Sequence, residues 1–307
     1  MKIRGACVIV AIVFVALGLA STLRAEAQTD SKLKSLTLGL VFHGPPEPVV
    51  KRFRPFVEYL GRKVVPGRKA KSVVTVAPTV AQLTKLLEQK RVDFYLESPY
   101  PTYLINRSSH ATILLRRWKG GVSDYRSLIV TNKASRIARL EDLRGKIVAF
   151  EDAGSTSGYF LPKLLLFKRG FSVVEKAALE VKVPEAEIGY IFAATEKNIV
   201  NLIVQEKVAA GAISSDDYDG LDEKTKASLS ILAESESLPR HLLSVHRKLS
   251  KPVVMSLKET LLGMHRDSEG LRILGQTDDT TKFDTLPGGE VTFRRTVMEL
   301  YRPRGGN

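Results

Sequence analysis

Apolar positions along this chain alternate between two spacings in a regular order. Residues 36–41 alternate as a strand does, whereas residues 49–60 place apolar side chains at the 3.6-residue spacing of a helix. Residues 73–76 and 92–96 indicate two more strands, and a capping box that begins at Thr79 indicates a helix between them. Strands and helices in alternation predict parallel βαβ units.

The same order continues through the second half of the chain. We predict strands over 127–131, 147–150, 209–213, 229–233 and 242–246, with helices over 159–169, from Thr195 onward and over 253–264. The fold class is therefore α/β, and the chain is long enough for two lobes that each have a core. We assign residues 34–129 and 233–288 to lobe 1, and residues 130–232 to lobe 2. Residues 289–307 form a basic tail that we expect to be frayed.

The turn after the strand at 147–150 is a candidate anion site. Three hydroxyl residues, Ser155, Thr156 and Ser157, lie between two glycines, of which the second is Gly158. The glycines allow a sharp turn, and the hydroxyls and the free N–H groups of the following helix can donate hydrogen bonds to an oxyanion. The alternative is ordinary capping of that helix by serine or threonine.

Other polar residues follow neighbouring strands of the predicted sheets. His43 follows the first strand, Tyr100 follows the third, and Asp216 follows the strand at 209–213. Ligands of open parallel sheets bind beyond the carboxyl ends of the strands, so we expect these residues to converge on a cleft between the lobes. For His43, packing on a neighbouring aromatic ring such as Tyr100 is the alternative.

The N-terminus has the pattern of a secretory signal. Lys2 and Arg4 precede an apolar run over residues 5–20, and the small residues of 25–27 suit cleavage after residue 27. We therefore predict a cleaved signal peptide over residues 1–27 and a periplasmic protein, with an uncleaved membrane anchor as the alternative. The single cysteine, Cys7, lies in this signal, so the mature chain would have no disulfide, catalytic thiol or cysteine metal site.

The chain is strongly basic, with a formal net charge of +14. Such a charge raises the rate of encounter with anions, although most lysines and arginines are expected to be solvated surface residues. The charge is scattered along the sequence and accompanies no known nucleic-acid motif, so we predict no nucleic-acid partner.

Two segments around the turn resemble a known family. The phrase at residues 143–152, followed by Ser-Thr-Ser-Gly-Tyr at 155–159, resembles the phosphate, phosphite and phosphonate substrate-binding proteins of ABC transporters, the PhnD-like family. The resemblance extends from about residue 36 to about residue 285. It implies the type II periplasmic binding protein fold, in which two α/β lobes joined by a hinge of two crossing strands close around a solute.

The resemblance also implies roles for particular residues. Ser155, Thr156 and Ser157 would hold the oxyanion with Gly158, and Tyr100 or Tyr103 would line the opposite wall.

The pattern departs from the family at Glu196. The family has a Ser-His-Asp segment there whose histidine helps to bind the phosphonate; here Thr195 keeps a hydroxyl, but Glu196 replaces the histidine. A carboxylate repels a dianion, so either Glu196 points away, or a cation offsets it, or the solute is less charged or bears an amine. The last option would suit an acidic wall that includes Glu97 or Asp216.

Catalysis and metal binding are poorly supported by the sequence. An esterase elbow needs Gly-x-Ser-x-Gly, but Thr156 is central here, and the histidines lie in no triad context. His241 and His246 have the wrong spacing for one helical face, so no metal site is predicted.

We therefore expect a monomeric, non-enzymatic protein without cofactor or metal. Its expected ligand is a small phosphonate-like or phosphate-like anion, with a less charged or amine-bearing solute as the alternative. Its expected partner is an ABC permease, and presentation of the liganded form to a membrane sensor kinase remains open.

Overall fold

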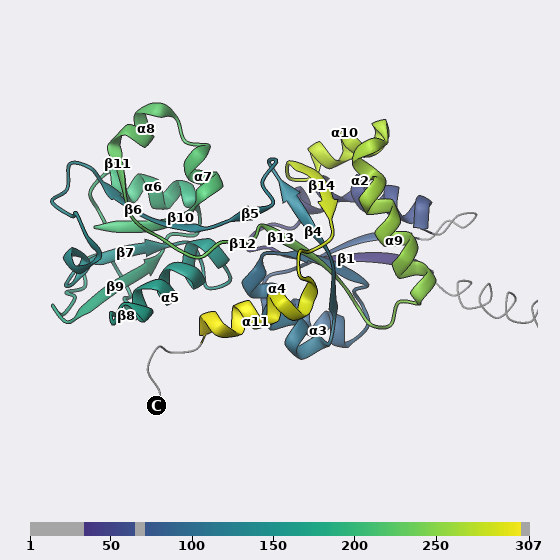
Figure 1. Cartoon of the computed structure of the whole chain (residues 1–307), viewed down its shortest axis with the longest axis horizontal. Helices are drawn as coiled ribbons and strands as arrows, with labels where there is room; N and C mark the ends of the chain where they lie inside the picture. The colour runs from purple at the N-terminus through teal and green to yellow at the C-terminus, as the bar shows by residue number, and fades with distance from the viewer. Residues whose placement is uncertain (1–33, 65–70, 302–307) are drawn as a thin grey trace, which may run out of the picture.

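The structure, a computed structural model, describes residues 34–64 and 71–301 of the chain (Figure 1). Two six-stranded sheets, each with helices on both faces, form two lobes that lie side by side. The predicted signal peptide lies outside the described residues. Within those residues, no helix combines the length and the apolar character that crossing a membrane requires.

The first sheet has the strand order β14-β4-β13-β3-β1-β2. Its strands are β1 (Ser35–Val41), β2 (Lys71–Ala77), β3 (Phe94–Glu97), β4 (Thr112–Lys119), β13 (His241–Val245) and β14 (Thr280–Asp284). Strands β1, β2 and β3 are parallel, as the βαβ pattern predicts, whereas β13 and β14 add antiparallel pairings with β3 and β4. We call this sheet and its helices lobe 1.

Helices cover both faces of the first sheet. On one face, α2 (Glu47–Val64), α9 (Lys251–Gly263) and α10 (Ser268–Gln276) pack on alternate residues of β1, including Leu36 and Leu38. On the other face lie α3 (Val80–Glu88) and α4 (Pro99–Ser109). Of the predicted capping box, the N-cap bond is confirmed, because Thr79 Oγ1 accepts a hydrogen bond from Gln82 N at 3.1 Å.

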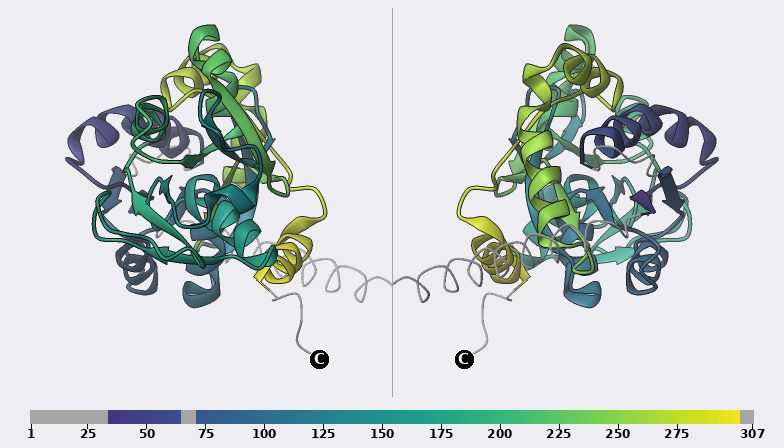
Figure 2. Two further views of the ribbon diagram at one scale, coloured as in Figure 1. Left: turned by 90° about the vertical axis from the view of Figure 1, so that its left-hand side faces the viewer. Right: turned by 90° about the vertical axis from the view of Figure 1, so that its right-hand side faces the viewer.

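The second sheet has the strand order β11-β6-β10-β7-β9-β8. Its strands are β6 (Ser127–Asn132), β7 (Ile147–Phe150), β8 (Ser172–Glu175), β9 (Glu187–Phe192), β10 (Ala210–Ser214) and β11 (Leu229–Glu234). Helix α5 (Leu161–Lys168) covers one face and α6 (Glu196–Val204) covers the other. The short helices α7 (Ser215–Asp219) and α8 (Glu223–Ser228) follow β10. We call this sheet and its helices lobe 2, and the end-on views in Figure 2 show the helices flanking each sheet.

The lobes are joined by two short strands that pair with each other. β5 (Asp124–Tyr125) and β12 (Leu238–Pro239) form an antiparallel two-stranded sheet between the lobes (Figure 1). The predicted boundaries at 129/130 and 232/233 fall inside β6 and β11, which both hydrogen-bond within the second sheet. The chain therefore crosses between the lobes at β5 and β12, and not at the predicted boundaries.

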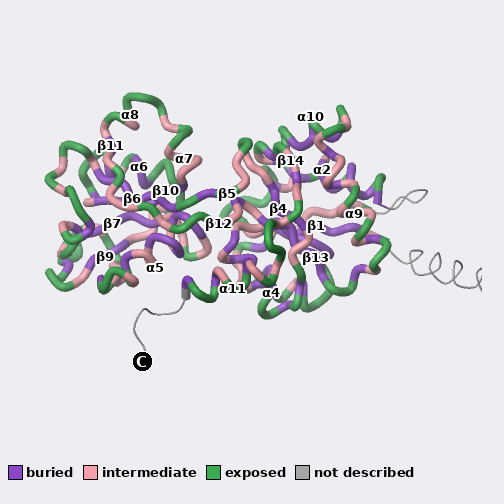
Figure 3. The backbone as a smooth tube through the Cα atoms, in the orientation of Figure 1, coloured by how far each residue is buried: buried purple, intermediate pink, exposed green. Residues whose placement is uncertain are grey.

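The C-terminal segment differs from the predicted frayed tail. Residues Gly289–Tyr301 form a helix, α11, and three of its apolar side chains are buried: Phe293, Val297 and Leu300. Phe293 and Val297 pack against lobe 1 near Leu242, and Leu300 packs near Phe160 of lobe 2. Basic composition favoured a tail, but three apolar residues at helical spacing on one face bury enough surface to dock the helix. Figure 3 shows where buried and exposed residues lie along this helix and in the two lobes.

Candidate functional site

A cavity of about 500 Å³ lies between the two lobes. Both lobes and strand β5 of the crossing supply its lining. Among the residues that the sequence singles out, the cavity is lined by His43, Ser155, Thr156, Ser157, Thr195 and Glu196. The remaining predicted site residues, Gly158, Tyr100, Tyr103 and Asp216, do not line it.

The hydroxyl turn lies between β7 and α5, as the sequence pattern predicts. The chain enters the helix through a single π-helical turn, Thr156–Phe160, and α5 itself begins at Leu161. The predicted helix at 159–169 therefore starts three residues earlier, with a wider first turn. Such turns are rare in helices and are often found at functional sites.

The hydroxyls of the turn already have partners within the protein. Ser155 Oγ accepts a hydrogen bond from Gly158 N at 2.9 Å, which is the capping arrangement that the sequence left as an alternative. The same hydroxyl donates to Glu151 Oε2 at 2.6 Å. Thr156 Oγ1 donates to Ser98 Oγ at 2.9 Å. The turn is thus a cap and, at the same time, part of the cavity wall.

Glu151 is the residue beside this turn that the sequence reasoning missed. Its carboxylate lines the cavity and lies against Gly158, where an added Cβ would be 2.5 Å from Glu151 Cβ and 2.7 Å from Oε2. Only glycine at position 158 therefore allows the glutamate to lie along the turn. The one signal in the sequence is its position directly after β7, at the carboxyl end of a central strand.

The turn also connects the lobes directly. Tyr100 N, at the start of α4 in lobe 1, donates a hydrogen bond to Thr156 Oγ1 at 2.9 Å. The rings of Tyr100 and Phe160 stack in parallel, with centroids 4.3 Å apart. These contacts hold α4 of lobe 1 against the turn of lobe 2.

The two tyrosines predicted for the opposite wall lie elsewhere. The ring of Tyr100 is taken up by its stack on Phe160, and Tyr103, one turn further along α4, packs near Phe293 of α11. The tyrosine that lines the cavity is Tyr125 of β5, and burial raises its pKa to about 12. The prediction of an aromatic wall thus named residues from the wrong segment.

Asp216 has a structural partner. Arg240, which follows β12, donates from Nε to Asp216 Oδ2 at 2.6 Å, and both side chains are largely buried. The guanidinium of Arg240 also lies 4.5 Å from the ring centroid of Tyr125. Arg240 and the next residue on α7, Asp217, line the cavity instead of Asp216. This ion pair joins lobe 2 to the chain that leaves the crossing strands.

The charges of the cavity wall are divided between the lobes. Lobe 2 contributes four carboxylates, which belong to Glu151, Asp152, Glu196 and Asp217. Lobe 1 and the crossing contribute the cations Lys119 and Arg240, the histidines His43 and His241, and one carboxyl group, that of Glu97. Burial and the neighbouring cations lower the pKa of His241 well below its ordinary value, so this histidine is neutral.

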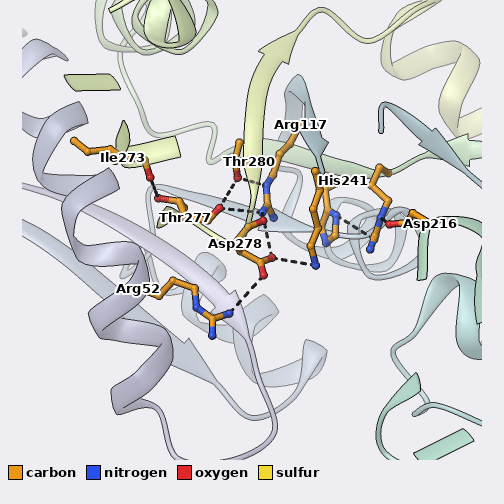
Figure 4. Close-up of polar contacts among 10 residues, drawn as sticks. Arg52, Arg117, Asp216, His241, Ile273, Thr277, Asp278 and Thr280 are labelled. Carbon is orange, nitrogen blue, oxygen red and sulfur yellow. Dashed lines mark hydrogen bonds and ion pairs between the residues drawn. The ribbon is translucent and has the colours of Figure 1, made fainter. Parts of the chain in front are cut away.

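Lys119 is positioned by a carboxylate behind the cavity wall. Asp278 Oδ2 lies 3.4 Å from Lys119 Nζ and 3.1 Å from Arg117 Nη2. Figure 4 shows Asp278 between Arg117 and Arg52, with His241 beside this group. Arg117 itself is fully buried, and it donates to Thr280 Oγ1 at 2.7 Å. Among the described residues, no group of three or more histidine, cysteine or acidic side chains is arranged to hold a metal ion.

Two cavity carboxyls make the stability of the protein depend on pH. Burial raises the pKa of Glu151 to about 7 and that of Glu97 to about 8, from an ordinary value of 4.5. Between pH 4.5 and these raised values the folded chain holds protons that the unfolded chain has lost, so stability falls as the pH rises. Below about pH 6.5 the lowered pKa values of His241 and His246 act in the opposite direction, so we expect the urea midpoint of the unliganded protein to decrease from about pH 6.5 to about pH 8.

The variant Glu97→Gln tests this pH dependence. Glutamine keeps an oxygen that can accept the hydrogen bond that Val41 N donates to Glu97 Oε1 at 2.7 Å, but it does not titrate. The variant should therefore have a flatter pH profile than the wild type, whereas Glu223→Gln, at an exposed carboxylate, should follow the wild type. A midpoint that increases over this range, or an unchanged slope in Glu97→Gln, would contradict the assignment.

Two α/β lobes, a two-stranded crossing and a cavity between them define the class of type II periplasmic binding proteins. Comparison with known proteins gives the family within this class. Residues 38–286 match the family described as the periplasmic substrate-binding protein of the phosphonate ABC transporter. The chain belongs to this family, as the resemblance in the sequence implies, and the family comprises substrate-binding transporter components and not enzymes.

Solved structures agree with this assignment. XAC2383 from Xanthomonas citri, solved with a chloride ion, is 26% identical over 87% of this chain and 96% of its own, with a TM-score of 0.80. The same protein solved with ATP is 25% identical over 87% and 95% of the two chains, with a TM-score of 0.76. PhnD1 from Prochlorococcus marinus, solved with methylphosphonate, shares the fold at 15% identity, with a TM-score of 0.66 over 88% and 97%.

Proposed function

We propose that this protein is exported by a cleaved signal peptide, captures a small solute with an oxyanion group between its lobes, and delivers it to an ABC permease. The observation that carries the proposal is the cavity of about 500 Å³, which is lined by both lobes at the crossing strands. A solute in it contacts both lobes, so its binding stabilises the closed arrangement over an open one.

The chemistry of the wall supports a ligand with an anionic group. Lys119 and Arg240 both line the cavity, and guanidinium and ammonium groups are the usual partners of phosphonates, phosphates and carboxylates. XAC2383, the similar protein at 25–26% identity, is described as bound to chloride and to ATP, which are both anions. The strongly basic chain would also raise the encounter rate with such solutes.

A thermal-shift screen tests the proposal. The panel is phosphate, phosphite, methylphosphonate, sulfate and aminoalkylphosphonates, each added to the full mature chain. A ligand at 100 times its dissociation constant adds about 2.7 kcal/mol to the free energy of unfolding, which raises the melting temperature clearly. Fluorescence of Trp118, the single tryptophan, which adjoins Lys119 of the cavity wall, gives a second readout. If no solute of the panel changes either signal, the proposed ligand class is wrong.

A further inference from the structure

The C-terminal helix α11 lies against both lobes. Its middle belongs to lobe 1, where Phe293 and Val297 are buried together with Leu242 of β13. Its last turn reaches a different apolar cluster, in which Leu300 packs with Phe160 of lobe 2. Figure 1 shows α11 beside α4, with its C-terminal end directed towards α5 of lobe 2. One helix therefore bridges the two lobes that the crossing strands join.

Leu300 completes a cluster whose members come from four different segments. Tyr100 belongs to α4 of lobe 1, Leu238 belongs to β12, and Phe160 and Leu161 lie where the chain enters α5 of lobe 2. The rings of Tyr100 and Phe160 stack with centroids 4.3 Å apart. We call these five residues the interlobe cluster. Their burial requires all four segments to be in place at once, so the cluster stabilises the described arrangement of the lobes.

The root of α11 is fixed to lobe 1. Glu290 Oε2 accepts a hydrogen bond from Ile113 N of β4 at 3.1 Å. Asp284, at the end of β14, accepts hydrogen bonds from Arg116 Nε at 2.9 Å and from Arg116 Nη2 at 2.7 Å. The same guanidinium donates from Nη1 to Asp124 of β5, so it ties the strand that precedes α11 to the crossing. When lobe 2 turns about the crossing, α11 therefore stays with lobe 1.

Such a rotation would separate Phe160 from both Leu300 and Tyr100. It would also break the hydrogen bond of 2.9 Å that Tyr100 N donates to Thr156 Oγ1. We call the arrangement with these contacts closed. The freed polar groups could bond to water, so their net contribution to closure is small. The apolar side chains have no such compensation in water, so the interlobe cluster favours the closed arrangement even without a solute.

We propose that α11 is a strap that holds the lobes closed before a solute binds, with Leu300 as its point of contact with lobe 2. No described residue of α11 lines the cavity. The apparent affinity for a solute depends on the fraction of closed molecules, so the strap would change the affinity for every solute by the same factor. It acts on the protein without solute, and its test therefore does not require the ligand class proposed above.

Double electron–electron resonance on the unliganded mature chain measures the effect of the strap. The single cysteine, Cys7, lies in the predicted signal peptide, so spin labels can be attached at two introduced cysteines. These are Glu223→Cys in lobe 2 and Leu271→Cys in lobe 1, at side chains that are both exposed. Leu300→Ala in this background should lower the ratio of closed to open molecules about tenfold, which corresponds to about 1.4 kcal/mol. A second interlobe distance should appear in the distribution.

Two further positions on the same helix provide matched controls. Val297 is buried against lobe 1 alone, so Val297→Ala should lower the melting temperature but keep the interlobe distance of the parent protein. Val291 is 82% exposed, so Val291→Ala should change neither quantity. Leu300→Val removes less apolar surface than Leu300→Ala and should give a smaller shift in the same direction. It keeps the test decisive if the alanine variant loses the helix.

Two results would overturn the strap. The first is an interlobe distance distribution in both Leu300 variants that matches that of the parent protein. The second is an equal shift in Leu300→Ala and Val297→Ala, because the contact of Leu300 with lobe 2 would then have no role of its own. A shift that is confined to the Leu300 variants, with unchanged circular dichroism, supports it.

Discussion

Replacing Arg240 by alanine is expected to destabilise the protein by about 3–5 kcal/mol, the usual cost of removing one partner of a buried ion pair. Arg240 and Asp216 have side chains that are only 9% and 15% exposed, and Asp216 Oδ1 already lacks a hydrogen-bond partner. Without the guanidinium, the carboxylate would remain buried beside Asp217 with no compensating cation. Urea unfolding at neutral pH, followed by circular dichroism, measures the loss.

Another ion pair of the same segment provides the control for this prediction. Arg126 Nη1 lies 2.7 Å from Glu234 Oε2, but the two side chains are 49% and 46% exposed. Arg126→Ala should therefore cost less than about 1 kcal/mol. The double variant Arg240→Ala with Asp216→Ala should regain part of the loss, because no unpaired carboxylate is left. If Arg240→Ala and Arg126→Ala lower the free energy of unfolding equally, burial of an ion pair does not determine its contribution to stability here.

Replacing Gly158 by alanine is expected to abolish solute binding and to destabilise the protein by about 1–3 kcal/mol, as overpacking of a dense site does. The added Cβ would lie 2.5 Å from Glu151 Cβ and 2.9 Å from Ser155 Oγ. The glutamate, the serine cap and the π-helical turn would therefore have to move together. The thermal-shift screen and calorimetric titration measure the loss of binding.

Gly154→Ala is the matched control, because it makes the same change at the other end of the turn. The nearest atom to the added Cβ would be Asp152 Oδ1 at 3.1 Å, a side-chain atom that can shift. The backbone of Gly154 is not in the left-handed region. The control should therefore keep most of the stability and part of the binding. A Gly158→Ala variant that binds ligand as well as Gly154→Ala does would contradict the role given to the turn.

Local patterns were sufficient to predict much of the fold. Strands β1, β7 and β10 and helices α2 and α3 follow from alternation, helical spacing and a capping box, which all act over a few residues. Strand β4 was not predicted, because Arg116 and Arg117 interrupt its apolar run. They are buried there because Asp284 and Asp278, more than 160 residues away, pair with them.

The candidate site was predicted only where its residues have a local pattern in the sequence. The turn at Ser155 has a local signature, and Glu196 stands out against the pattern of a family. Apart from Glu97, which the sequence offered as part of an acidic wall, the other charged residues of the cavity wall were missed, because their placement depends on how the lobes face each other. Glu151 and Arg240 have no distinctive neighbours in the sequence, and Tyr125 lines the cavity only because β5 crosses between the lobes. A prediction from spacing alone could not choose Tyr125 over Tyr100 or Tyr103.

The crossing at β5 and β12 has a consequence for how such a protein can be altered. Tyr125 pairs directly with Leu238. The chain therefore enters and leaves lobe 2 at adjacent positions, as it does in a domain inserted into another domain. Four of the five carboxyl groups that line the cavity, those of Glu151, Asp152, Glu196 and Asp217, lie within lobe 2, and the cations Lys119 and Arg240 lie outside it. A recombination event at these two points would exchange the side of the cavity that belongs to lobe 2 and keep the side that belongs to lobe 1. New solute specificities could arise by swapping whole lobes between relatives, without a series of single substitutions.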